Sequence, residues 1–101
     1  MSNVKIVPVN GKTPSVNSKV YVFHSDAGHG WLAVKRKELI ELGIIDEVSS
    51  CSYQRGNTVY LEEDCDASLF IQAMKTQGKP IQYRVSNVEY SRIRGYERFS
   101  A

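Results

Sequence analysis

Long apolar runs are missing from this sequence, and their absence excludes a large class of proteins. A membrane-spanning helix needs about 18 consecutive apolar residues, and no segment of the 101-residue chain approaches that length. The first residues, 1–5, also lack the apolar stretch of a secretory signal. We therefore expect a cytoplasmic protein that has no membrane partner.

Cysteine and net charge are both scarce. Two cysteines, Cys51 and Cys65, are too few for a disulfide scaffold, and a cytoplasmic setting favours free thiols. A net charge of +2 does not by itself imply binding to nucleic acid. The charge is unevenly distributed, because residues 62–66 carry four acids whereas residues 75–98 carry six basic residues against two acids.

Specific catalytic motifs are absent as well. The sequence contains no Gly-x-Ser-x-Gly nucleophile motif, no Cys-x-x-Cys and no Gly-x-Gly-x-x-Gly phosphate loop. These absences favour a protein that is not an enzyme and that needs no cofactor.

Hydrophobic patterning predicts a single α+β domain over residues 1–101. Strands are predicted near residues 4–9, 20–23, 31–34, 49–54, 58–62 and 81–85, the first at a sheet edge because it contains Pro8. Helices are predicted at 36–42 and 65–77, ending at Gly43 and Gly78, with Asp64 or Asp66 capping the second. We expect a mostly antiparallel sheet of five to six strands with two helices packed on one face.

The stretch from His24 to Trp31 holds both histidines and the only tryptophan. His24, Asp26 and His29 offer three potential metal ligands, although their spacing matches no specific zinc signature. Alternatively, His29 pairs with an acid of the 62–64 segment for acid–base chemistry. The structural alternative is a hairpin loop in which Asp26 bonds to its own turn and His29 packs near Trp31.

Two charged segments suggest binding surfaces. The acidic run at 62–66 exceeds what a helix N-terminus requires, so its surplus predicts a contact for a basic partner. If extended, the C-terminal segment would place arginine and tyrosine on one side, the pattern of a surface that holds phosphates and stacks bases. Its alternative is an edge strand protected by arginine. The candidate nucleic-acid contacts are Arg92, Arg94, Tyr96 and Arg98.

Residues 20–75 resemble a family of small uncharacterised proteins of phages and mobile elements. The resemblance lies in Gly28-His29-Gly30-Trp31-Leu32-Ala33-Val34, in Leu39 and Leu42-Gly43-Ile44, and in Ser52-Tyr53 and Gly56 ahead of Val59-Tyr60-Leu61-Glu62-Glu63-Asp64. It implies a small accessory protein that acts on a host system, and it assigns no catalytic residue.

The favoured hypothesis is an interaction protein that binds a host protein through the 24–31 loop and the acidic run. The predicted contacts are His29, Trp31, Glu62, Glu63, Asp64 and Asp66. The alternatives are nucleic-acid binding by the C-terminal segment and metal-dependent hydrolysis at His24, Asp26 and His29.

Overall fold

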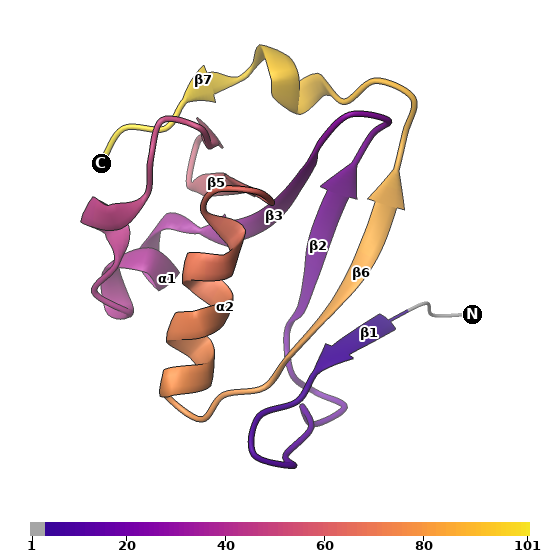
Figure 1. Cartoon of the computed structure of the whole chain (residues 1–101), viewed down its shortest axis with the longest axis vertical. Helices are drawn as coiled ribbons and strands as arrows, with labels where there is room; N and C mark the ends of the chain where they lie inside the picture. Colours follow the sequence, from indigo (N-terminus) through magenta and orange to yellow (C-terminus); the bar gives the residue numbers. More distant parts are fainter. Residues whose placement is uncertain (1–3) are drawn as a thin grey trace.

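The computed structural model describes residues 4–101, which contain seven strands and two α-helices. The strands are β1 (Val4–Val7), β2 (Val20–Ser25), β3 (Gly30–Lys35), β4 (Tyr53–Arg55), β5 (Thr58–Glu62), β6 (Ile81–Asn87) and β7 (Glu97–Arg98). The helices are α1 (Arg36–Glu41) and α2 (Ala67–Thr76), with two 3-10 helices, η1 (Ile45–Glu47) and η2 (Arg92–Gly95). The strands form one sheet in the order β1-β6-β2-β3-β5-β4-β7 (Figure 1).

The sheet is mixed, which confirms the α+β class and corrects the predicted detail. β2 and β6 pair in parallel, whereas the other pairs among the described residues are antiparallel. The parallel pair arises because α2 carries the chain back along the sheet after β5, so β6 runs in the direction of β5 and β2. The seventh strand, β7, comes from the C-terminal segment and lies at an edge of the sheet, which agrees with the edge-strand alternative for that segment.

Both helices end as their glycines predict. Gly43 has a φ of 73°, and the amide of Ile44 donates to the carbonyl of Leu39 at 3.0 Å, which closes a Schellman motif after α1. The amide of Lys79 donates in the same way to Met74 at 2.9 Å after α2. Asp66 holds the N-cap position before α2, as predicted, but the capping bond predicted for an aspartate is absent because the Asp66 side chain does not bond to the helix.

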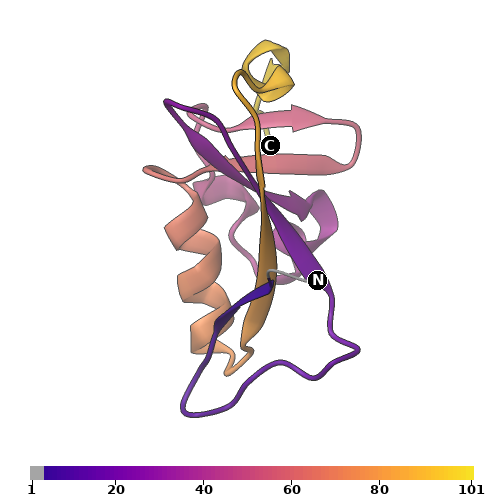
Figure 2. The same ribbon diagram turned by 90° about the vertical axis from the view of Figure 1, so that its right-hand side faces the viewer.

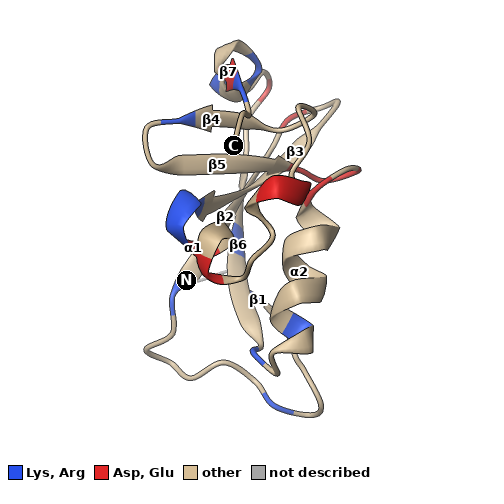
Figure 3. Ribbon diagram, turned by 90° about the vertical axis from the view of Figure 1, so that its left-hand side faces the viewer, with Lys and Arg blue, Asp and Glu red and all other residues tan. Residues whose placement is uncertain are grey.

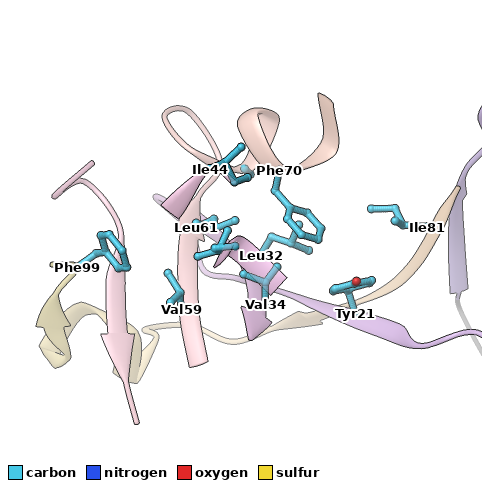
Figure 4. Close-up of a cluster of buried hydrophobic side chains, with 11 residues drawn as sticks. Tyr21, Leu32, Val34, Ile44, Val59, Leu61, Phe70, Ile81 and Phe99 are labelled. Atoms are coloured by element: carbon cyan, nitrogen blue, oxygen red, sulfur yellow. The ribbon is translucent and has the colours of Figure 1, made fainter. Parts of the chain in front are cut away.

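The core lies between the helices and the face of the sheet that carries Tyr21, Leu32 and Leu61, which we call the helix face (Figure 4). The ring of Phe70 meets that of Tyr21 edge-on at 5.4 Å between centroids. The hydroxyl of Tyr21 donates to a carboxylate oxygen of Glu38 at 2.5 Å, so α1 packs on the same face. Desolvation and the neighbouring Glu38 carboxylate raise the pKa of Tyr21 well above its usual range. In Figure 2, β6 is seen nearly edge-on and α2 lies to one side of it.

The helices cover only part of this face. In Figure 1, α2 lies beside β3 and β5, whereas β6 and β1 lie away from both helices. The opposite side of the sheet, which we call the outer face, carries His24, Ala33 and Tyr60 and has no α-helix among the described residues. No helix within residues 4–101 is long and apolar enough to cross a membrane.

Candidate functional site

Asp26 is the centre of the turn between β2 and β3. One carboxylate oxygen accepts the amides of Gly28 at 3.0 Å and His29 at 3.1 Å, which orders the turn. The other oxygen accepts the amide of Ser91 at 2.9 Å. The guanidinium of Arg94 donates to both oxygens at 2.7 Å. These bonds hold the pKa of the Asp26 carboxyl far below its usual range, the Arg94 pair being the largest cause.

This arrangement corrects the metal hypothesis. The Asp26 carboxylate is fully occupied by hydrogen bonds from the protein, and His24 packs against Tyr60 on the outer face with 5.8 Å between ring centroids. Burial and the nearby Arg84 cation lower the pKa of His24. Within residues 4–101, no three His, Cys, Asp or Glu side chains are grouped so as to hold a metal ion. His24, Asp26 and His29 therefore do not form a ligand set.

The predicted proximity of the 24–31 loop and the acidic run is confirmed. The Nδ1 atom of His29 lies 3.1 Å from a carboxylate oxygen of Glu62. The imidazole is half exposed, whereas the Glu62 side chain keeps only 10% exposure. The second oxygen of Glu62 accepts the amide of Asp64 at 2.9 Å, so the carboxylate also shapes the turn that follows β5.

Trp31 and Asp66 are placed by the structure inside the protein, which corrects their predicted role as exposed contacts. Trp31 is 2% exposed, and its indole Nε1 donates to no acceptor among the described residues. Asp66 is 4% exposed. One of its oxygens accepts the amide and hydroxyl of Ser49 at 3.1 and 2.9 Å and the hydroxyl of Ser52 at 2.5 Å. Asp66 therefore anchors the chain that leads into β4.

The acidic run is thus a turn in which only part of the charge faces solvent. We call residues 62–66 the acidic turn. Glu63 and Asp64 are exposed. Glu62 and Asp66 are buried, and their carboxylates accept the hydrogen bonds described above. Figure 3 shows the acidic turn beside the N-terminal end of α2, with a second acidic segment close to it. The surface charge predicted for the run is therefore carried by two residues.

A hollow of about 480 Å³ opens beside the acidic turn, and we call it the polar cavity. Its walls come from four parts of the chain: the β2–β3 turn, the segment before β4, the acidic turn and the C-terminal segment. The lining residues are His29, Trp31, Cys51, Tyr53, Glu62, Asp64, Cys65, Arg94 and Arg98.

The C-terminal segment does not present its arginines on one side, because residues 92–95 turn as η2. Arg94 is bound to Asp26 and stacks over Trp31 at 5.7 Å. Arg98 lies over the Tyr53 ring at 4.8 Å and donates to the carbonyl of Ser50 at 3.1 Å. Arg92 is exposed. The four residues predicted to contact nucleic acid are therefore divided between the polar cavity and the outer face, where Tyr96 lies.

A second hollow, of about 370 Å³, lies on the other side of the acidic turn, and we call it the apolar groove. It occupies the part of the helix face that the helices leave uncovered. The lining residues are Lys5, Val7, Phe23, Leu32, Glu63, Ala67, Ser68, Ile71, Ile81, Tyr83 and Val85. A side chain at Gly30 would place its Cβ 2.4 Å from the Phe23 ring, so glycine is required where that ring crosses the backbone.

Sequence reasoning missed both this groove and the Asp26–Arg94 pair. The sequence did contain a signal for the groove. Residues 20–23 are apolar on both faces of their strand, and apolar and polar residues alternate over residues 81–85. The pair had none, because a contact across 68 residues leaves no local pattern.

No protein-family model, no curated protein and no solved structure matches this chain. The functional argument therefore depends on the geometry of the site.

Proposed function

We propose that this chain is a protein-interaction module that binds a host protein through the apolar groove and the acidic turn. The observation that carries the proposal is their arrangement, since an exposed acid of the turn stands at the rim of an apolar hollow. Glu63 itself lines the groove. The host assignment rests on the resemblance of residues 20–75 to phage and mobile-element proteins.

The apolar groove has the composition of a contact surface. Phe23 and Tyr83 meet edge-on at 6.3 Å between ring centroids and form its floor. Val85 is 41% exposed at its margin. Apolar surface gathered in a hollow is stabilised when a partner covers it, because burying it releases water.

Charge at the rim defines the partner's chemistry. Glu63 stands at one side of the groove, and Lys5 lies across the sheet from it on β1. Asp64, the next exposed acid of the turn, lines the polar cavity. A segment that places apolar side chains in the groove and a lysine or arginine beside the acidic turn would complement both features. The partner we propose is therefore an apolar segment with a flanking basic residue.

Affinity capture from host lysate with matched variants tests this proposal. Val85→Glu places a charge at the groove, and Ile40→Glu is its control, because Ile40 is 57% exposed on α1. Paired Glu63→Lys and Asp64→Lys changes test the acidic turn, with Glu41→Lys on α1 as the control at an exposed acid elsewhere. A protein captured by the wild type and both controls, but lost with both test variants, is the expected result. Equal capture by all variants, or no specific capture, would refute the proposal.

A second candidate function, binding of single-stranded nucleic acid, is favoured by the outer face. The ring of Tyr60 lies 5.8 Å from that of His24 and 5.2 Å from that of Tyr96, which makes a partly exposed row of rings. Arg55 lies over Tyr96 at 5.1 Å. Rings with arginines between them can stack bases and bind phosphates.

Fluorescence anisotropy with a labelled single-stranded oligonucleotide tests this second function across a range of salt concentrations. Each phosphate contact contributes a slope of about −0.7 to the dependence of log K on log salt. Replacing Arg55 and Arg92 with glutamine should therefore reduce the slope by about 1.4. Replacing Lys37 and Lys75 on the helices should leave it unchanged. The absence of binding at low salt, or an equal loss with both pairs, would reject this function.

A further inference from the structure

Cys51 and Cys65 are brought together by a set of buried hydrogen bonds. Ser52 follows Cys51 and Asp66 follows Cys65, and these two neighbours are joined by the 2.5 Å bond from the serine hydroxyl to the carboxylate. The Ser52 hydroxyl also accepts the amide of Glu62 at 3.1 Å, which fixes the start of the acidic turn. The cysteines are therefore next to a fixed point of contact between two segments.

Further bonds hold the backbone around Cys51. Its amide donates to the hydroxyl of Ser49 at 3.1 Å, and that hydroxyl donates in turn to Asp66 at 2.9 Å. The carbonyl of Ser52 accepts the amide of Phe99 at 2.9 Å. With bonds on both sides of it, Cys51 has little freedom to move away from Cys65.

The two thiols are free and exposed, and both line the polar cavity. The bond between their neighbours Ser52 and Asp66 brings the two segments that carry them together. Hydrogen bonds from Cys65 and Ser49 lower the pKa of Cys51. The hydrogen bond with Cys51, followed by desolvation, raises the pKa of Cys65 to about 12. These directions favour Cys51 over Cys65 as the thiol that ionises first.

We propose that Cys51 and Cys65 form a dithiol site that exchanges with small-molecule disulfides and passes reversibly into an intramolecular disulfide. The Cys51 thiolate attacks one sulfur of the small disulfide, forming a mixed disulfide and releasing one thiolate. Cys65 then gives up its proton and attacks the Cys51 sulfur, which releases the second small thiol. The two protein thiols lose two electrons and two protons, and the small disulfide is reduced to two thiols.

The geometry favours closure over a stable mixed disulfide. The Ser52–Asp66 bond holds together the backbone segments next to the two cysteines. The native fold therefore supplies Cys65 at a high effective concentration. The proposal is independent of the partner-binding function, since it needs neither the groove nor a partner.

Equilibration with mixtures of reduced and oxidised glutathione tests the dithiol site. Acid quenching, alkylation and intact-mass measurement then count the free thiols. We expect the native protein to lose two hydrogen atoms without retaining glutathione. It should do so at a mixture roughly tenfold more reducing than the urea-unfolded chain requires. The proposal would be overturned if the disulfide formed at the same glutathione mixture in the native and the urea-unfolded protein, or if each native chain retained two glutathiones.

Single-cysteine variants separate the two chemical steps. Both cysteines are exposed, so Cys51→Ser and Cys65→Ser should fold, which circular dichroism checks. Cys65→Ser should stop at a glutathione adduct on Cys51, because the resolving thiol is gone. In the wild type, brief alkylation followed by peptide mapping should label Cys51 before Cys65. Faster labelling of Cys65 would contradict the assigned roles.

Discussion

The two hollows beside the acidic turn are built in different ways. The polar cavity is framed by hydrogen bonds between distant segments, among them Asp26–Arg94 and Ser52–Asp66. The apolar groove has no such frame and exists because α2 covers only part of the helix face. The first is therefore a rigid structure that can position chemistry, whereas the second is an unfilled part of the core face that a partner can complete.

The largest predicted loss of stability should distinguish the part of the helix face that α2 covers from the apolar groove. Phe70, on the sheet-facing side of α2, is fully buried, so Phe70→Ala should lower the free energy of unfolding by about 3–5 kcal/mol. Val85 lies at the groove margin, and Val85→Ala should cost less than about 1 kcal/mol. Urea unfolding monitored by the fluorescence of Trp31 measures both. Similar losses for the two variants would mean that the groove is part of the core.

The next effect concerns the charged pair that ties the C-terminal segment to the β2–β3 turn. Arg94→Gln leaves the Asp26 carboxylate without its cation in a site where the side chain is 1% exposed. Because the folded pKa of Asp26 is depressed, its contribution to stability is complete above the unfolded pKa and declines below about pH 4. The stability gap between wild type and Arg94→Gln should therefore be wide at neutral pH and narrow in acid. A gap that does not change with pH would disprove the electrostatic role, and Arg92→Gln serves as the exposed control.

Features of this fold that depend on neighbouring residues could be predicted from the sequence, whereas features that depend on contacts between distant segments could not. The helix ends at Gly43 and Gly78 and the β4–β5 hairpin follow from local patterns, and all were predicted. An acid of the 62–64 segment was expected near His29, and the pairing of β3 with β5 brings Glu62 there. The opposite outcome holds for Asp66, whose carboxylate was expected to cap α2 and instead binds Ser49 and Ser52.

The parallel pairing of β2 with β6 and the folding of the C-terminal segment over the cavity depend on segments far apart in sequence. Arginines at 92, 94 and 98 look alike in the sequence, yet one is tied to Asp26, one stacks on Tyr53 and one remains exposed. Local composition cannot distinguish these environments, because each is created by a partner from another part of the chain.

A smaller effect should follow from releasing the anchor of the polar cavity. Asp66→Asn weakens the bonds to Ser49 and Ser52, which should cost about 1–3 kcal/mol in urea unfolding. It should also loosen the segment that carries Cys51, so the intramolecular disulfide should need a more oxidising glutathione mixture. Asp64→Asn, at an exposed acid of the same turn, is the matched control. Unchanged closure in Asp66→Asn would show that the anchor does not position the thiols.

The smallest effect should appear at His24 on the outer face. Burial is the main cause that lowers the pKa of His24, and the Arg84 cation lowers it further. Arg84→Gln removes the second cause, so the pKa of His24 should rise towards its usual value while remaining below it. Titration of the imidazole by NMR measures this directly, and Arg55→Gln is the control because Arg55 lies over Tyr96. The folded protein should then lose less stability as pH falls through the unfolded pKa of histidine, since a histidine with a less depressed pKa resists protonation less. A pKa of His24 that is the same in Arg84→Gln and wild type would leave burial as the whole cause.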